Sequence, residues 1–174
     1  MRAFLVLFCF IAVLVLGVAM ATTYTVDEGE TGVILTSGAI SGEAASGRHF
    51  KNPFFDDVVY VSNRAQTYKF ENVQAYSLDQ QVGTLQLSAT FSVPKGESKT
   101  IYSRYGSIDS FVSRVLSPRT QTVFKTIFGK TTALKATSEQ DKLLIAFKEQ
   151  LQTSIGDEVV LESVQIENLD FSDQ

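Results

Sequence analysis

The chain has 174 residues, with 15 Lys or Arg against 19 Asp or Glu, and its formal net charge of −4 argues against a nucleic-acid partner. Phosphate binding requires a basic stripe, and we expect none in this chain. Thirteen Phe and six Tyr, without any Trp, can supply a sizeable core. The one cysteine, Cys9, excludes an intrachain disulfide and a metal site built from cysteines.

The first element in chain order is an uncharged apolar run from Ala3 to Ala21, preceded by Arg2. As a helix rising about 1.5 Å per residue, the run reaches roughly 28 Å, close to the roughly 30 Å hydrocarbon core of a bilayer. We therefore expect residues 1–22 to form a transmembrane anchor. Its apolar side chains include Phe4, Leu7, Ile11, Leu14, Leu16 and Val18.

The charges on either side of the run predict its orientation. Arg2 lies before it, and the acidic residues of 27–30 follow it. This asymmetry places the N-terminus in the cytoplasm and the following domain on the periplasmic, non-cytoplasmic side. The alternative is a signal peptide cleaved after Ala21, because residues 19–21 have the small-x-small pattern of a cleavage site. The mature chain would then be a secreted or periplasmic binding module.

After the run, the pattern predicts a strand-rich subdomain over residues 23–94. Short β segments are expected at 23–26, 32–36, 58–61 and 66–71. Between the second and third of these, three glycines and Pro53 predict a loop, because both residue types interrupt strands. The strongest signal is an alternation of apolar and polar residues, which predicts a strand with one buried and one wet face. Its apolar members are Leu85, Leu87, Ala89, Phe91 and Val93.

The period of the pattern changes near Pro94, and a helical second subdomain is expected over residues 95–174. Helices are predicted at 97–105 and after a cap at Ser107. A further helix is predicted near Pro118, which suits a first turn better than a helix interior. Ser138 resembles the start of a capping box for the next helix. A strand over 159–170 closes the chain, so the fold class is α+β with two subdomains.

The residue pattern predicts no catalytic, cofactor or metal site. His49 is the single histidine and has no second ligand beside it in sequence, so a structural role is expected. Asp56 and Asp57 are adjacent on a predicted strand, where neighbouring side chains point to opposite faces, and this disfavours a carboxylate pair. The glycines match no phosphate-binding loop. A hydrolase that uses Ser with Lys stays open, although no motif links such a pair.

Several strings, taken in order, resemble one family. They are Val26–Val33 (VDEGETGV), Gly47–Pro53 (GRHFKNP), Ser77–Val82 (SLDQQV), Ile101–Gly106 (IYSRYG), Val115–Pro118 (VLSP) and Val164–Asp170 (VQIENLD). Together they resemble the stomatin, prohibitin, flotillin and band 7 (SPFH) domain over essentially Thr23 to Ser172. The apolar run lies where prohibitin-like members carry an anchor. Two departures are the Glu139-Gln140-Asp141 step, where prohibitins have an arginine, and the lack of a heptad-patterned helix after the domain.

The resemblance implies a non-enzymatic, membrane-anchored scaffold that oligomerises laterally and organises membrane microdomains. The partners that it implies are the lipid bilayer, further copies or a related SPFH protein, and an AAA-type membrane protease; it implies no cofactor. Lateral contacts are expected through the edges of the domain and the helices between Ser107 and Phe128. The candidate side chains are Phe111, Val115, Val123 and Phe128.

Phe54 and Phe55 have two interpretations. Core packing is the expected one, because clustered aromatic side chains after a proline turn are commonly buried. The alternative is a membrane-interface tip. The family resemblance favours this alternative, because such members rest the first subdomain on the bilayer and the anchor ends a short distance upstream.

Overall fold

The computed structural model describes residues 22–172, and its internal contacts divide the chain into two compact units, Met1–Ser62 and Asn63–Gln174. This division falls earlier than the boundary expected after residue 94. Strand pairing is the reason, because β6 (Gln66–Tyr76) and β7 (Val82–Ser92) form one antiparallel sheet with β8 (Val160–Ser172). Both long strands therefore belong to the same unit as the helices.

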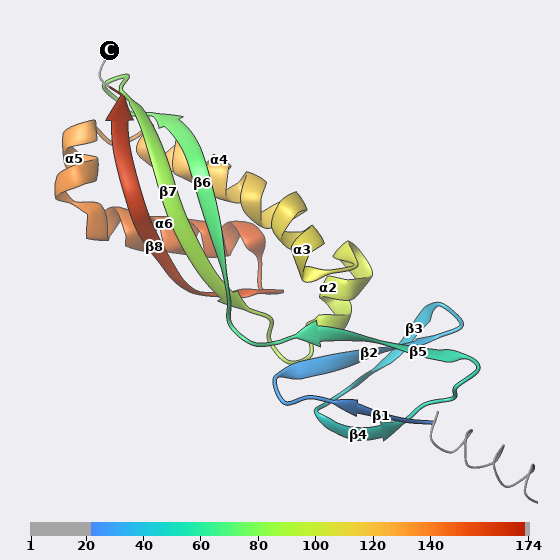
Figure 1. Ribbon diagram of the computed structural model, residues 1–174. Helices are drawn as coiled ribbons and strands as arrows, with labels where there is room; N and C mark the ends of the chain where they lie inside the picture. The colour runs from blue at the N-terminus through green and yellow to red at the C-terminus, as the bar shows by residue number, and fades with distance from the viewer. Residues whose placement is uncertain (1–21, 173–174) are drawn as a thin grey trace, which may run out of the picture. The chain divides into compact units, whose positions relative to one another are not determined.

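The first unit consists of short strands in two small antiparallel sheets (Figure 1). In one sheet, β1 (Thr23–Val26) pairs with β4 (Gly47–Phe50). In the other, β2 (Glu30–Thr36) lies between β3 (Ala39–Ala44) and β5 (Asp56–Ser62).

The loop predicted after residue 36 is wrong, because β3 and β4 form there. Ile34 pairs with Gly42 and Leu35 with Ile40, so a bulge absorbs Ser41 and lets the glycine-containing segment continue the ladder. Both strands are largely exposed and carry few large apolar side chains. Backbone hydrogen bonds rather than apolar alternation hold these strands, and the sequence pattern therefore gives no strand signal.

The first unit has a small core. Tyr24, Val26 and Ala44 are buried together, and Ile34 and Val58 pack against them. Burial of apolar area stabilises a fold in proportion to that area, at roughly 25 cal/mol per Å². A cluster of this size gives the first unit a modest apolar contribution to its stability.

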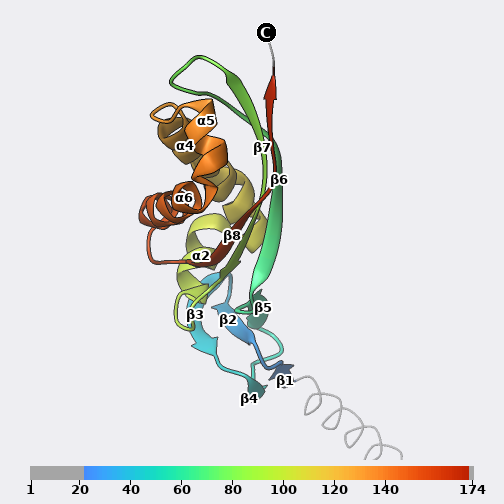
Figure 2. The same ribbon diagram turned by 90° about the vertical axis from the view of Figure 1, so that its left-hand side faces the viewer.

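In the second unit, the helices cover one face of the β6-β7-β8 sheet and leave the other face open (Figure 2). They are α2 (Ser98–Tyr105), α3 (Ile108–Phe111), η1 (Val112–Leu116), α4 (Ser117–Phe128), α5 (Ala133–Ser138) and α6 (Gln140–Ile155). α4 packs against β6, and α6 packs against β8 and α4. The two longest helices therefore pack on the same face of the sheet, α4 toward the β6 edge and α6 toward the β8 edge.

The alternation predicted for β7 is confirmed. Its inward row is buried and consists of Leu85, Leu87, Ala89 and Phe91. Phe128 of α4 is fully buried, and its ring centroid lies 5.0 Å from that of Phe124 and 5.9 Å from that of Phe171 in β8. A Cβ on Gly83 would lie 2.5 Å from Phe128 Cζ, so the ring requires a glycine at this position.

The cap predicted at Ser107 is confirmed, because its hydroxyl accepts a hydrogen bond from the Ser110 amide at 3.1 Å. The first-turn position predicted for Pro118 is confirmed, because α4 begins at Ser117. No loop precedes this helix, since α3 passes through the π-helical turn η1 directly into α4. A π turn interrupts the α-helical bonding pattern, which makes the missing amide hydrogen of proline tolerable there.

The capping box predicted at Ser138 is wrong. Ser138 is the last residue of α5, and α6 begins at Gln140 without a side-chain cap. A side-chain cap occurs one helix earlier, at Thr132 before α5, whose hydroxyl accepts a hydrogen bond from the Lys135 amide at 3.4 Å. Ser and Thr have the same capping chemistry, so residue type alone does not show which of them begins a helix.

Within residues 22–172, no helix combines the length and the apolar character needed to cross a bilayer. The predicted anchor lies outside the described residues. Its side chains are Phe4, Leu7, Ile11, Leu14, Leu16 and Val18.

Candidate functional site

His49 has a structural environment. Its Nε2 atom lies 2.6 Å from the carbonyl oxygen of Ala45, to which the ring N–H donates, and its ring centroid lies 5.5 Å from that of Tyr24. The imidazole therefore ties β4 to the preceding turn and to β1. Within residues 22–172, no group of three or more His, Cys, Asp or Glu side chains could hold a metal ion.

Asp56 holds a turn rather than forming a pair with Asp57. Its carboxylate accepts hydrogen bonds from the Thr36 hydroxyl at 2.7 Å and from the Asn52 amide at 2.9 Å. The bonds from Asn52 and Thr36, together with the nearby Lys51 cation, lower the pKa of Asp56 below its usual value. Successive residues of β5 point to opposite faces, so the two carboxylates do not form a shared acid–base site.

The turn that Asp56 holds presents aromatic side chains to solvent. Phe50, Phe54 and Phe55, which we call the aromatic loop, are 78%, 77% and 60% exposed. The expected core packing of Phe54 and Phe55 is therefore wrong. The turn closes through its own polar groups, because Asn52 Oδ1 accepts from the Phe54 amide at 3.1 Å. Hence neither phenyl ring is needed to fill the core.

The aromatic loop lies beside the start of the described chain. Phe50 pairs with Thr23 in the β1–β4 ladder, and the Lys51 amide donates to the Thr22 carbonyl at 2.7 Å. The sequence places the end of the apolar run directly before Thr22. The exposed aromatic residues therefore lie at the edge of the first unit where the described chain begins.

The predicted self-association residues are core residues of the second unit. Phe111, Val123 and Phe128 are 1%, 4% and 0% exposed, and Val115 is half-buried against the same core. Their spacing on one helical face was identified correctly, but that face contacts the chain's own sheet. Sequence periodicity cannot distinguish a buried face from an intermolecular one, and the prediction of an interface through these side chains is wrong.

Exposed basic residues lie on η1, α4, α5 and the turn between α4 and α5, and the composition did not reveal them. Between Asp109 and Glu139 the sequence has five basic and no acidic residues. These five residues, which we call the basic surface, are Arg114, Arg119, Lys125, Lys130 and Lys135, and all five are exposed. The signal was local charge segregation, which the net charge of −4 conceals.

Two cavities open onto the basic surface. Lys130, Lys135 and Lys142 line one of about 310 Å³ between α4, α5 and α6. Lys125 lines another of about 450 Å³ beside Tyr76 at the end of β6. Lysine amines thus line both hollows, and in the first of them Glu139 is also a lining residue and pairs with Lys142 at 3.2 Å.

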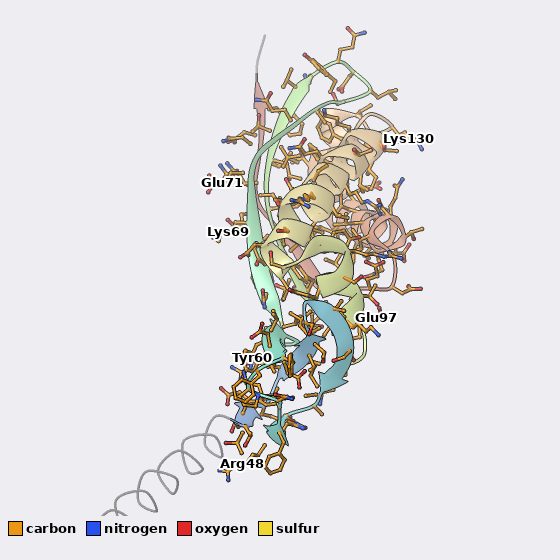
Figure 3. The ribbon with its side chains drawn as sticks, turned by 90° about the vertical axis from the view of Figure 1, so that its right-hand side faces the viewer. Arg48, Tyr60, Lys69, Glu71, Glu97 and Lys130 are labelled. Atoms are coloured by element: carbon orange, nitrogen blue, oxygen red, sulfur yellow. The ribbon has the colours of Figure 1, made fainter. Side chains whose placement is uncertain are left out.

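The last strand carries charge of the opposite sign. From Gly156 onward the sequence has acidic residues and no basic one. We call the described acidic residues the acidic edge: Asp157, Glu158, Glu162, Glu167 and Asp170. Within the unit, Glu158 pairs with Arg104, and Glu167 pairs with Lys69 at 3.0 Å. Figure 3 shows Lys69 and Glu71 projecting from the open side of the sheet, whereas Lys130 lies on the helix side.

The described chain combines an all-β unit that exposes the aromatic loop with an α+β unit that has charged outer surfaces. The family model described as SPFH domain / Band 7 family matches residues 24–174, and the chain belongs to this family. No curated protein matches the chain. The family is generally one of membrane-associated scaffolding proteins, and its members are generally not enzymes.

Proposed function

We propose that the protein is a membrane-anchored scaffold of the prohibitin-like type. In this proposal, copies associate laterally, organise a membrane microdomain and regulate embedded partners such as an AAA-type membrane protease. The observation that carries the membrane contact is the aromatic loop. Three phenyl rings lie exposed at the edge of the first unit where the apolar N-terminal run ends.

Exposure of these rings has a physical cost in water that a bilayer removes. Fully burying one Phe side chain stabilises by roughly 1.5 to 3 kcal/mol. Three such rings beside a helical anchor can therefore fix the first unit against the interface. The backbone of the loop is held by Asn52 and Asp56, and the rings project without rearrangement of the unit.

A tryptophan reporter tests the membrane contact, because the natural chain contains no Trp. Phe54→Trp in the full chain, reconstituted in vesicles, is expected to give blue-shifted emission that brominated lipids quench. Tyr76→Trp is the matched control, since Tyr76 is 68% exposed but lies in the second unit. Emission from Phe54→Trp that is as red and as unquenched as that of the control would contradict the proposed contact.

The proposed topology places the N-terminus in the cytoplasm and both units on the non-cytoplasmic side. Arg2 before the apolar run and acidic residues after it support this orientation. Protease added outside spheroplasts should digest both units, and complete protection with an intact membrane would reverse the orientation. Intact mass of the mature protein distinguishes the anchored form from a product cleaved after Ala21.

A further inference from the structure

The second unit carries opposite charges on different elements. The basic surface includes α4, which packs against β6, at one edge of the sheet. The acidic edge lies on and directly before β8, at the other edge of the sheet. Lys125 shares a cavity with Gln74, Ala75 and Tyr76 of β6, which places this cation on the β6 side. A single unit therefore presents cations on its helix layer and carboxylates on and directly before β8.

Much of this charge has no ionic partner in its own unit. Within the described residues, no salt bridge involves any of the five cations of the basic surface, nor Asp157, Glu162 or Asp170 of the acidic edge. By contrast, Lys69 and Arg104 are both paired with acidic residues. The charge without a salt bridge is thus positive on the basic surface and negative on the acidic edge.

Strand addition is a poor alternative route for joining two copies. β8 has register shifts that leave Glu162 and Glu167 as extra residues opposite β7. β6 has a similar shift between Phe70 and Val73, where Asn72 has a positive φ of 57°. Bulges and charged residues on edge strands interrupt the hydrogen-bonding row that another strand would need. Contact between side-chain surfaces is therefore favoured over a continuous sheet.

We propose that copies of this chain associate head to tail, with the basic surface of one copy against the acidic edge of the next. This inference rests on the lateral self-association proposed above and assigns its two surfaces. Two different surfaces make a heterologous contact, which leaves one free surface at each end and permits rings or longer arrays. In this arrangement, Lys130 and Lys135 face carboxylates of the neighbouring copy from the rim of the cavity that Glu139 also lines.

The choice of a second copy as the occupant follows from charge complementarity within one chain. The basic surface requires a partner with several carboxylates, and every copy presents one along β8. Anchored copies also share a plane, which raises their effective concentration. Exposed charge pairs are weak individually, so an extended contact of several pairs is required for association.

Zero-length crosslinking tests the contact in intact membranes. A carbodiimide joins a carboxylate to a lysine amine without a spacer, and mixed light and isotope-labelled chains separate links between copies from links within one copy. We expect intermolecular links between residues 125–135 and residues 157–170. The yield of multimers should fall as ionic strength rises, because the Debye length shortens from about 10 Å at 0.1 M salt to about 3 Å at 1 M.

Charge reversal on each side provides the decisive variants. Arg119→Glu with Lys125→Glu alters the basic surface, and Glu162→Lys with Asp170→Lys alters the acidic edge. Each pair should lower the multimer yield about tenfold, because like charges then face one another. Coexpression of the two variants, or combination of all four changes in one chain, should restore it. Lys95→Glu is the matched control, since Lys95 is exposed and lies on neither surface.

The outcomes separate this inference from the proposed scaffold. A multimer ladder that both reversals leave unchanged would overturn the head-to-tail contact while leaving lateral association intact. Loss of the ladder without rescue by the combined reversals, in chains with native circular dichroism, would also overturn it. Reversal of the basic surface that weakens binding to anionic vesicles but spares the ladder would assign that surface to lipid. Monomer alone from the natural chain would overturn both proposals.

Discussion

The two units use aromatic side chains in opposite ways. In the second unit, Phe91, Phe111, Phe124 and Phe128 are all at most 1% exposed and fill the space between sheet and helices. In the first unit, the phenyl rings of the aromatic loop face outward while a much smaller cluster forms the core. The comparison shows that the number of aromatic residues does not measure the size of a core. Their placement distinguishes a unit stabilised by its own packing from one that presents apolar surface to a partner.

The sharpest test of this comparison removes one phenyl ring from each unit. Phe128→Ala should destabilise the second unit by about 3 to 5 kcal/mol, because it leaves a cavity in a fully buried cluster. Phe54→Ala should change stability by less than about 0.5 kcal/mol, because its ring is exposed. Urea denaturation of the full chain in detergent, followed by circular dichroism, measures both. A large loss from Phe54→Ala would mean that its ring supports the core after all.

Glycine substitutions extend the comparison to the backbone. Gly83→Ala should cost about 1 to 3 kcal/mol, because the new methyl group would lie 2.5 Å from Phe128 Cζ. Gly42→Ala in β3 has open space around it and should be neutral or stabilise by up to about 0.5 kcal/mol. Thermal melts of the two variants provide the measurement. Partial rescue of Gly83→Ala by Phe128→Leu would confirm the ring as the cause, and equal costs at both glycines would contradict it.

Buried hydroxyl groups give a further contrast. Among the described residues, Tyr24 Oη in the first unit and Thr120 Oγ1 in α4 are buried without a hydrogen-bond partner. Burying a hydroxyl without such a partner costs roughly 1 to 3 kcal/mol. Thr120→Val and Tyr24→Phe should therefore each stabilise the chain, by about 1 kcal/mol. Unchanged or lower melting temperatures would show that each hydroxyl has a partner in solution.

The smallest predicted effect on stability is that of acid pH. It should destabilise one turn in each unit. Asp56 accepts from the Asn52 amide, and Asp79 accepts from the Ser77 hydroxyl and the Ala133 amide. These bonds lower the pKa of both carboxyl groups below 3.8. A lowered folded-state pKa contributes stability above the unfolded value of 3.8, and this contribution is lost as pH falls through the folded value.

Amide proton shifts measure this effect locally. Those of Asn52 and Ala133 should titrate below pH 3.8, as their carboxylate acceptors are protonated. Asp56→Asn should abolish the titration at Asn52 and spare that at Ala133, and Asp79→Asn should do the reverse. Midpoints at or above 3.8 would contradict the stabilising role of the ionised carboxylates.

Sequence reasoning succeeded where one physical signal dominates. β7 was predicted from strict alternation, and the Ser107 cap from its hydroxyl before a helical face. It failed for β3 and β4, because ladder hydrogen bonds hold these glycine-containing strands without an apolar pattern. It also failed for Phe54 and Phe55, because a turn closed by Asn52 and Asp56 needs no aromatic packing. The basic surface required a local count of charge rather than the overall one.

The π turn η1 determines how the apolar faces of α3 and α4 are oriented relative to each other. Each residue of an α-helix advances the face by about 100°. If residues 111–128 formed one unbroken α-helix, Phe111 would point away from the direction shared by Val123, Phe124 and Phe128. One extra residue taken up within Val112–Leu116 brings all four onto the side that packs against the sheet.

The orientation that η1 gives to α4 also directs Lys125 outward. Deleting Ser113 would convert the wide turn into an α turn while leaving both flanking faces in phase. Inserting one more alanine there would instead rotate α4 by about 100°, which would expose Phe124 and turn Lys125 toward the sheet. The chain should therefore tolerate a shorter segment at η1 far better than a longer one.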